Sequence, residues 1–118
     1  PTLSQIAASA AFDSYEEAED NVKRYAINRS ILMNELPSSG LNKLAPADGA
    51  FYIYADIAHF TNDSVEFCKR MLEEIGVACT PGLDFDPDRG DSTLRLSFSG
   101  AEHDMIDACK RIKAWLKK

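Results

Sequence analysis

The sequence predicts an α+β domain of two layers, in which a short, mainly antiparallel sheet is covered by helices. The first observation is the order of the elements, which reads helix, long helix, strand, helix, strand, strand, helix, without an internal repeat. The second is the short connection between the last two strands, which favours their pairing as neighbours. A length of 118 residues suits one such core.

The amino-acid composition argues against two classes of binding partner. The net charge is −6, from 13 Lys+Arg against 19 Asp+Glu, and the basic residues are scattered, so we expect no nucleic acid. Neither an apolar run of about 20 residues nor a signal segment is present, so we expect no membrane partner. An odd cysteine count without a C-x-x-C pair argues against disulfides or zinc and favours a reducing compartment, the cytoplasm.

The chain begins with two predicted helices. Residues 3–12 are rich in alanine and nearly uncharged, so we expect a short helix. It would pack either against this domain or against a part of the protein outside this chain. A second helix starts at a capping box formed by Ser14 and Glu17 and runs to Leu36, where Pro37 is expected to end it. This helix would be about 33 Å long at 1.5 Å per residue.

The middle of the chain alternates strand and helix. Residues 50–56 form an aromatic strand with both faces partly covered, which predicts an interior position in the sheet. A helix follows after the capping candidates of residues 61–64, and Gly76 ends it. Residues 77–79 read as a short strand. Two cysteines on apolar helix faces, Cys68 and Cys109, and Cys79 in that strand are expected to be small core residues.

Residues 83–92 form a polar loop with four aspartates, and the last strand and helix follow it. The loop lacks the spacing of a calcium-binding EF-hand, so we expect a mobile, solvated loop and no metal site. Residues 93–98 alternate as a strand. A terminal helix is expected after a capping box of Ser99 and Glu102, and its apolar positions are Met105, Cys109, Ile112 and Leu116.

Arg95 is the strongest candidate functional residue. Leu94, Leu96 and Phe98 share one face of its strand, so Arg95 points to the other face from a rigid support. The planar guanidinium matches the two oxygens of a carboxylate and stays charged at any working pH. An ordinary ion pair with a neighbouring acidic residue is the alternative reading.

Four short motifs occur in one order along the chain: Gly49-Ala50-Phe51-Tyr52, Gly76-Val77-Ala78, Thr80-Pro81-Gly82 with Phe85, and Arg95-Leu96-Ser97-Phe98. In order and spacing they resemble the C-terminal, small domain of class I/II aminotransferases of the pyridoxal-phosphate fold type I group. One departure is Asp86, which stands where the family commonly has glycine. The resemblance implies that residues 1–13 belong to a large domain, that 14–38 form the inter-domain helix, and that 39–118 form the small domain.

The resemblance also implies a function. The parent enzyme would transfer an amino group between an amino acid and a 2-oxo acid, with pyridoxal phosphate as the electron sink. Arg95 would bind the substrate α-carboxylate, Phe51 and Tyr52 would line the cleft, and the loop after Pro81 would close over the substrate. The Schiff-base lysine and the other cofactor-binding groups lie upstream in the family, so this chain alone is expected to hold no catalytic residue, bind no cofactor and be inactive.

Several alternatives remain open at this point. The family includes lyases and synthases that share the carboxylate arginine, and its members are commonly homodimers. A reading from a different class is a free-standing regulatory α+β module that binds an amino acid without catalysis. A third is a structural or dimerising piece in which Arg95 forms an ordinary ion pair. The regulatory module would bind its ligand alone, whereas the aminotransferase small domain needs the missing large domain.

Overall fold

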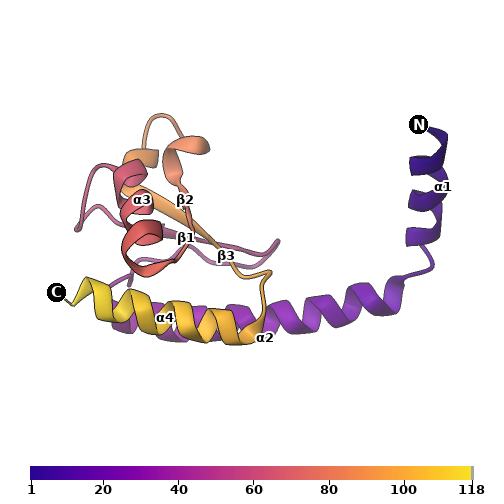
Figure 1. Ribbon diagram of the computed structural model, residues 1–118, viewed down its shortest axis with the longest axis horizontal. Helices are drawn as coiled ribbons and strands as arrows, with labels where there is room; N and C mark the ends of the chain where they lie inside the picture. The colour runs from indigo at the N-terminus through magenta and orange to yellow at the C-terminus, as the bar shows by residue number, and fades with distance from the viewer. Residues whose placement is uncertain (118) are drawn as a thin grey trace.

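The computed structural model describes residues 1–117 and confirms the α+β class (Figure 1). A three-stranded antiparallel sheet has the order β1-β3-β2, and residues 1–117 also form four α-helices and two 3-10 turns. In chain order the elements are α1 Thr2–Ala11, α2 Tyr15–Ser39, β1 Tyr52–Asp56, α3 Ser64–Ile75, β2 Thr80–Pro81, η1 Gly82–Asp84, η2 Gly90–Ser92, β3 Thr93–Ser97 and α4 Glu102–Leu116.

The central strand of the sheet is β3, and the prediction that the strand of residues 50–56 lies in the interior is wrong. That strand, β1, is an edge strand whose outer side is covered by the preceding connection. The Ala45 amide donates to the Tyr54 carbonyl oxygen at 2.9 Å, and the Asp56 amide donates to the Lys43 carbonyl oxygen at 2.9 Å. The side chains of β1 alternate between half-buried and buried, so both faces are partly covered as predicted. Composition does not reveal which strand pairs at each edge.

The prediction of a strand at residues 77–79 is also wrong by a few residues. Strand β2 consists of Thr80 and Pro81, which pair with Arg95 and Leu94 of β3. Val77 instead donates its amide to the Met71 carbonyl oxygen at 3.2 Å, as part of the turn that ends α3 at Gly76. Gly76 has a φ of 65°, in the left-handed region that favours glycine, as predicted.

The core lies between one face of the sheet and the helices. Ile53, Ala55, Leu94 and Leu96 alternate toward it along β1 and β3, and all four are buried. Cys68 and Cys109 are buried as predicted. The remaining buried apolar side chains come mostly from the helices and their connections: Leu32, Leu36, Leu41, Ala47, Ile57, Phe67, Met71, Val77, Phe98, Ile112 and Trp115.

Helices α2 and α4 lie side by side below the sheet and run in the same direction (Figure 1). Near their C-terminal ends the Lys113 ammonium donates to the Ser38 hydroxyl at 3.0 Å. Helix α2 continues three residues past the predicted end, with Pro37 inside its last turn, and it stops at Gly40, whose φ is 109°. A proline removes only one helical hydrogen bond, and the left-handed glycine ends the helix.

Two of the predicted capping boxes are absent. Neither Ser14 nor Ser99 caps a helix through its side chain, and the Ser99 hydroxyl lies 3.0 Å from that of Ser97. Helix α3 is capped from within the predicted range, because the Asp63 carboxylate accepts a hydrogen bond from the Glu66 amide at 3.0 Å. Residue type thus located the starts of these helices to within about two positions, and Ser14 is the N-cap residue of α2, but the side-chain bonds of the two capping boxes did not form.

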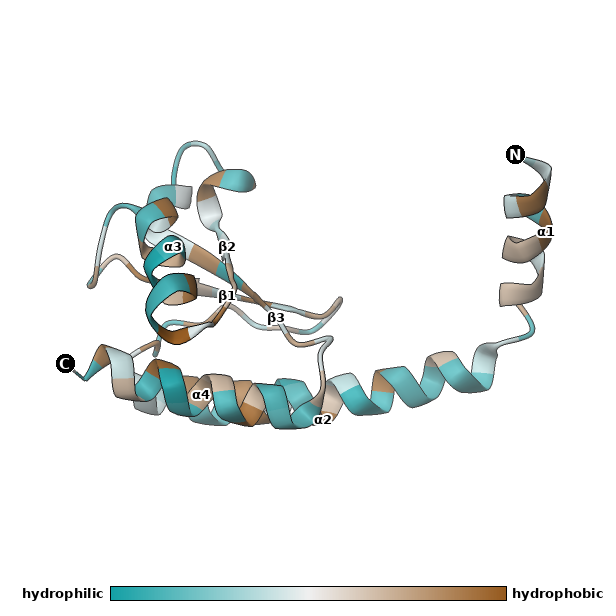
Figure 2. Ribbon diagram, viewed as in Figure 1, coloured by the Kyte–Doolittle hydropathy of each residue, from teal (hydrophilic) through white to brown (hydrophobic). Residues whose placement is uncertain are grey.

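Helix α1 and the first half of α2 extend away from the rest of the molecule (Figure 1). Helix α1 has no buried residue, and Leu3, Ile6 and Phe12 are 82%, 64% and 87% exposed. Figure 2 colours much of the α1 ribbon brown, which marks hydrophobic residues. Within residues 1–117, no helix combines the length and apolar character that crossing a membrane requires.

A buried asparagine joins α2 to the end of the central strand. The Asn28 side-chain amide donates to the carbonyl oxygens of Phe98 and Gly100, both at 2.9 Å. Asn28 is only 2% exposed, so water does not compete for these bonds. Because both carbonyl groups lie just before α4, this one side chain sets where α4 begins relative to α2.

We expect Asn28→Ala to lower the free energy of unfolding by about 1–3 kcal/mol, because it leaves two carbonyl groups without their partner in a dry site. Urea denaturation of the 118-residue chain, followed by the fluorescence of its single tryptophan, Trp115, measures this change. Asn34→Ala on the exposed part of the same helix is the matched control. Equal midpoints for the two variants would contradict the role of Asn28.

Candidate functional site

The open face of the sheet gathers the polar and aromatic side chains that the core leaves out. Along β3 the half-buried Arg95 points to this face, between the buried Leu94 and Leu96. Arg95 stands opposite Tyr54 of β1 and opposite Thr80 of β2. Tyr52 is the diagonal neighbour of Arg95 on the same face, at a separation that long and aromatic side chains bridge.

The Arg95 guanidinium lies between two aromatic rings. Its central carbon is 4.1 Å from the ring centroid of Tyr52 and 4.1 Å from that of Phe85. Cation–π attraction to each ring favours a guanidinium stacked flat, with its N–H donors directed outward at the edge. Among residues 1–117, Arg95 forms no hydrogen bond and no ion pair. The expected alternative, an ordinary ion pair of Arg95, is therefore not what the structure shows.

Tyr54 is a third aromatic residue near Arg95. Its ring meets that of Phe85 edge to face, with the centroids 6.2 Å apart. Burial raises the pKa of the Tyr54 hydroxyl; the nearby positive charge of Arg95 opposes this, and the charges of Asp86 and Asp84 reinforce it. Tyr54 therefore stays neutral at ordinary pH. It can donate a hydrogen bond to an anion beside Arg95 without adding a negative charge.

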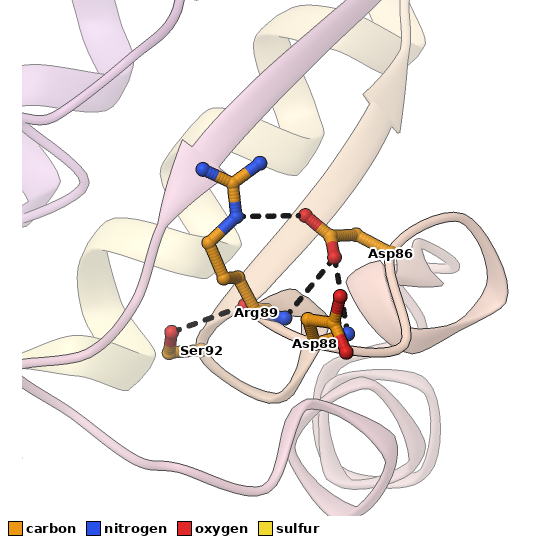
Figure 3. A network of polar contacts seen from close by, with 4 residues as sticks. All are labelled: Asp86, Asp88, Arg89 and Ser92. Atoms are coloured by element: carbon orange, nitrogen blue, oxygen red, sulfur yellow. Dashed lines mark hydrogen bonds and ion pairs between the residues drawn. The ribbon is translucent and has the colours of Figure 1, made fainter.

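The aspartate-rich loop that supplies Phe85 is folded on itself. Figure 3 shows the Asp86 carboxylate accepting from the backbone amides of Asp88 and Arg89, each at 3.1 Å, and from the Arg89 side chain at 3.1 Å. The Ser92 hydroxyl donates to the Arg89 carbonyl oxygen at 3.3 Å. The Asp88 amide first of all, then the Arg89 amide and guanidinium, lower the pKa of Asp86. The loop is solvated as expected, and its turns are specified by these bonds.

Two glycines close this loop at its base. A methyl group on Gly90 would overlap the carbonyl group of Gly82 and the amide of Leu83, and one on Gly82 would overlap the Gly90 oxygen. The backbones of η1 and η2 therefore touch directly, which only glycine allows at this approach. Because Phe85 follows η1 immediately, this contact helps fix where its ring lies relative to Arg95.

The structure brings one of the two predicted lining residues to Arg95. Tyr52 stacks on the guanidinium. Phe51 lies behind Tyr52, with ring centroids 4.4 Å apart, and also contacts Tyr25 of α2 at 5.9 Å. Phe85 is not among the site residues that the sequence predicts, although the motif Thr80-Pro81-Gly82 with Phe85 contains it. The ring lies ten residues from Arg95, and only the fold of the loop brings the two together.

Lys43 and Lys69 form ion pairs with acidic residues instead of lying among the side chains around Arg95. Lys43 is 65% exposed and forms an ion pair with Asp56 at 3.6 Å. Lys69 is 58% exposed and pairs with Glu66 at 3.8 Å. Across residues 1–117, no three histidine, cysteine or acidic side chains gather as a metal site would require. The side chains around Arg95 fit an anion with apolar flanks rather than a cofactor held by a lysine.

Two hollows of the surface lie away from Arg95. One of about 270 Å³ opens between α2, α4 and residues 76–78, and one of about 620 Å³ lies between α2 and α4. Arg95 lines neither of them. A carboxylate bound to Arg95 would therefore rest on an open sheet face, and a closed cleft there needs a covering surface from outside residues 1–117.

The sequence of this chain is similar to those of known aminotransferases. The model of the family "Aminotransferase class I and II" matches residues 1–112. A valine–pyruvate aminotransferase of Mycobacterium tuberculosis is 51% identical over 98% of this chain, which spans 30% of that relative. An aspartate aminotransferase of Sulfurisphaera tokodaii is 31% identical over 98% of this chain, which again spans 30% of the relative.

Solved structures agree with the sequence matches. An aminotransferase from Mycobacterium tuberculosis superposes with a TM-score of 0.94 at 50% identity, over 99% of this chain and 31% of its own. A putative aminotransferase from Silicibacter pomeroyi gives 0.95 at 45% identity, over 99% of this chain and 32% of its own. The chain thus spans about 30% of the length of the relatives it matches. It belongs to the class I and II aminotransferase family.

Proposed function

We propose that this chain is the C-terminal part of a longer aminotransferase, in which it binds the α-carboxylate of the amino acid and closes over the site. In this division residues 1–13 belong to the large domain, 14–38 form the inter-domain helix and 39–118 form the small domain. The observation that carries the proposal is the Arg95 guanidinium, which is stacked between two rings while its hydrogen-bond donors are unused within residues 1–117.

The surroundings of Arg95 support recognition of a carboxylate. A guanidinium edge offers two parallel N–H donors to the two oxygens, and such charge-assisted bonds are shorter and stronger than neutral ones. Tyr52 and Phe85 limit the rotation of the side chain, which lowers the entropy lost when the substrate binds. In this proposal Phe51 acts indirectly, by supporting the Tyr52 ring from behind.

In the proposed enzyme, the groups that bind the cofactor belong to the rest of the protein. Pyridoxal phosphate supplies the electron sink in this family, and within residues 1–117 Lys43 and Lys69 pair with Asp56 and Glu66 instead of lying beside Arg95. We therefore propose that the described residues bind only the substrate end of the reaction. The exposed apolar side chains of α1 support a covering large domain.

The proposed substrates are an amino acid and a 2-oxo acid. The 51% identical relative is a valine–pyruvate aminotransferase, so L-valine and pyruvate are the first pair to assay with the whole protein. For the whole protein we propose a homodimer in the cytoplasm; the three free cysteines of this chain fit a reducing compartment.

We expect Arg95→Lys in the whole enzyme to lower kcat/KM for amino acids by roughly 10–100-fold, since an ammonium loses the bidentate geometry and the stacking. Steady-state kinetics should show a higher KM and a lower turnover. Arg70→Lys is the matched control, because Arg70 also stacks on an aromatic ring, but on that of Trp115, and it pairs with Glu74 on α3. Wild-type kinetics in Arg95→Lys would refute the assignment.

We expect Phe85→Leu to raise the KM for amino acids about 2–5-fold with a smaller change in kcat, because the lost ring contact is worth about 0.5–1 kcal/mol. Phe85→Tyr keeps an aromatic ring and should restore the wild-type KM. Phe60→Leu serves as a control, since this ring contacts His59 and Phe67 instead of Arg95. A KM unchanged in Phe85→Leu would show that the ring does not position the guanidinium.

The regulatory-module alternative is distinguished by the isolated 118-residue chain. We expect isothermal titration calorimetry with L-valine, L-aspartate and pyridoxal phosphate to give no saturable heat, because the covering surface and the cofactor site are supplied by the rest of the enzyme. Saturable binding of an amino acid by the chain alone, abolished by Arg95→Lys, would favour the regulatory module instead.

A further inference from the structure

Three sulfur atoms converge on the side of α3 that faces the entry to β2. The Cys79 thiol donates a hydrogen bond to the Cys68 sulfur at 3.3 Å and also lies 3.5 Å from the Met71 sulfur. Cys68 and Met71 are buried on α3, and Cys79 is half-buried in the segment that leads into Thr80. The carboxylate-binding role proposed above uses none of these sulfur atoms.

We propose that Cys68 and Cys79 form a redox-active dithiol that closes to an intramolecular disulfide when a peroxide oxidises it. A disulfide bond is about 2.05 Å long, so the two sulfurs need to approach by only about 1.3 Å. The partners lie on an α-helix and on an extended segment. The bond would therefore tie two elements together rather than close a turn within one of them.

The chemistry is balanced with hydrogen peroxide as the oxidant. The Cys68 thiolate attacks one peroxide oxygen, the O–O bond breaks, and the departing hydroxide takes up a proton as water, which leaves a sulfenic acid on Cys68. The Cys79 sulfur then attacks the Cys68 sulfur, the S–S bond forms, and the S–O bond breaks with loss of a second water. Two thiols lose two electrons and two protons in total, and one peroxide becomes two waters.

The electrostatics of the pair suit this order of attack. The hydrogen bond from Cys79 lowers the pKa of the Cys68 thiol, while burial and the charge of Asp84 oppose that effect. The same hydrogen bond and burial raise the pKa of the Cys79 thiol. Cys68 is thus the member that forms a thiolate more readily, and Cys79 is the resolving partner.

The third cysteine provides an internal reference. Cys109 is buried on α4, and within residues 1–117 it takes part in neither of these sulfur contacts. Burial raises the pKa of its thiol to about 11. An isolated, protonated thiol reacts slowly with peroxide, so Cys109 should stay reduced under conditions that oxidise the pair.

The test uses the whole protein that contains this chain. It is treated with hydrogen peroxide, its free thiols are alkylated in denaturant, and its tryptic peptides are identified by mass spectrometry. Trypsin cleaves after Lys69 and Arg70, so Cys68 and Cys79 fall in different peptides. We expect these two peptides to be joined and to separate on treatment with dithiothreitol, while the Cys109 peptide is alkylated throughout.

Cysteine variants and a sample oxidised in urea serve as controls for this experiment. Cys109→Ala should keep the bridge, and Cys79→Ala should abolish it and leave Cys68 to accept a sulfenic acid trap. The wild type oxidised in urea should lose the preference for this pair, because only the fold brings the two sulfurs together. Recovery of both peptides alkylated, or oxidised separately to sulfinic and sulfonic acids, would overturn the proposal.

Discussion

The fold depends on how α2 is fastened to the end of the central strand. Asn28 is almost fully buried, and its amide satisfies two carbonyl groups in the short connection between β3 and α4. A buried amide with both protons donated specifies one position, whereas apolar contacts alone would tolerate sliding. Because the same connection follows the strand that carries Arg95, the long helix and the candidate site are held in a fixed position relative to each other.

The helices and the core cover one face of the sheet and leave the other face open. The side chains on the open face suit the binding of an anion. The core takes the alternating aliphatic side chains of β1 and β3, which leaves Tyr52, Tyr54 and Arg95 together on the other side. The folded loop adds Phe85 from above, so the charged group is held by ring faces instead of by a carboxylate. An acidic residue in that place would have used the donors that a substrate needs.

Local sequence signals predicted much of this fold. The helices followed from apolar spacing and Gly76, and the outward direction of Arg95 followed from the alternation of β3. Pairing order was not readable, because β1 is covered by residues 43–45 through backbone bonds that carry no side-chain signal. The contacts of Phe85 with Arg95 and of Cys68 with Cys79 depend on how the intervening segments fold, so spacing along the chain did not reveal them.

The bond from Asn28 to Phe98 spans 70 residues, and this has a consequence for biosynthesis. A ribosome that adds roughly 5–20 residues per second needs about 4–14 s to make the stretch between them. During that time α2 has emerged, but the strand end and the helix α4 that cover its apolar face have not. The nascent chain therefore exposes the stripe around Leu32 and Leu36 until α4 (Glu102–Leu116) appears, which makes this interval the natural moment for a chaperone to bind.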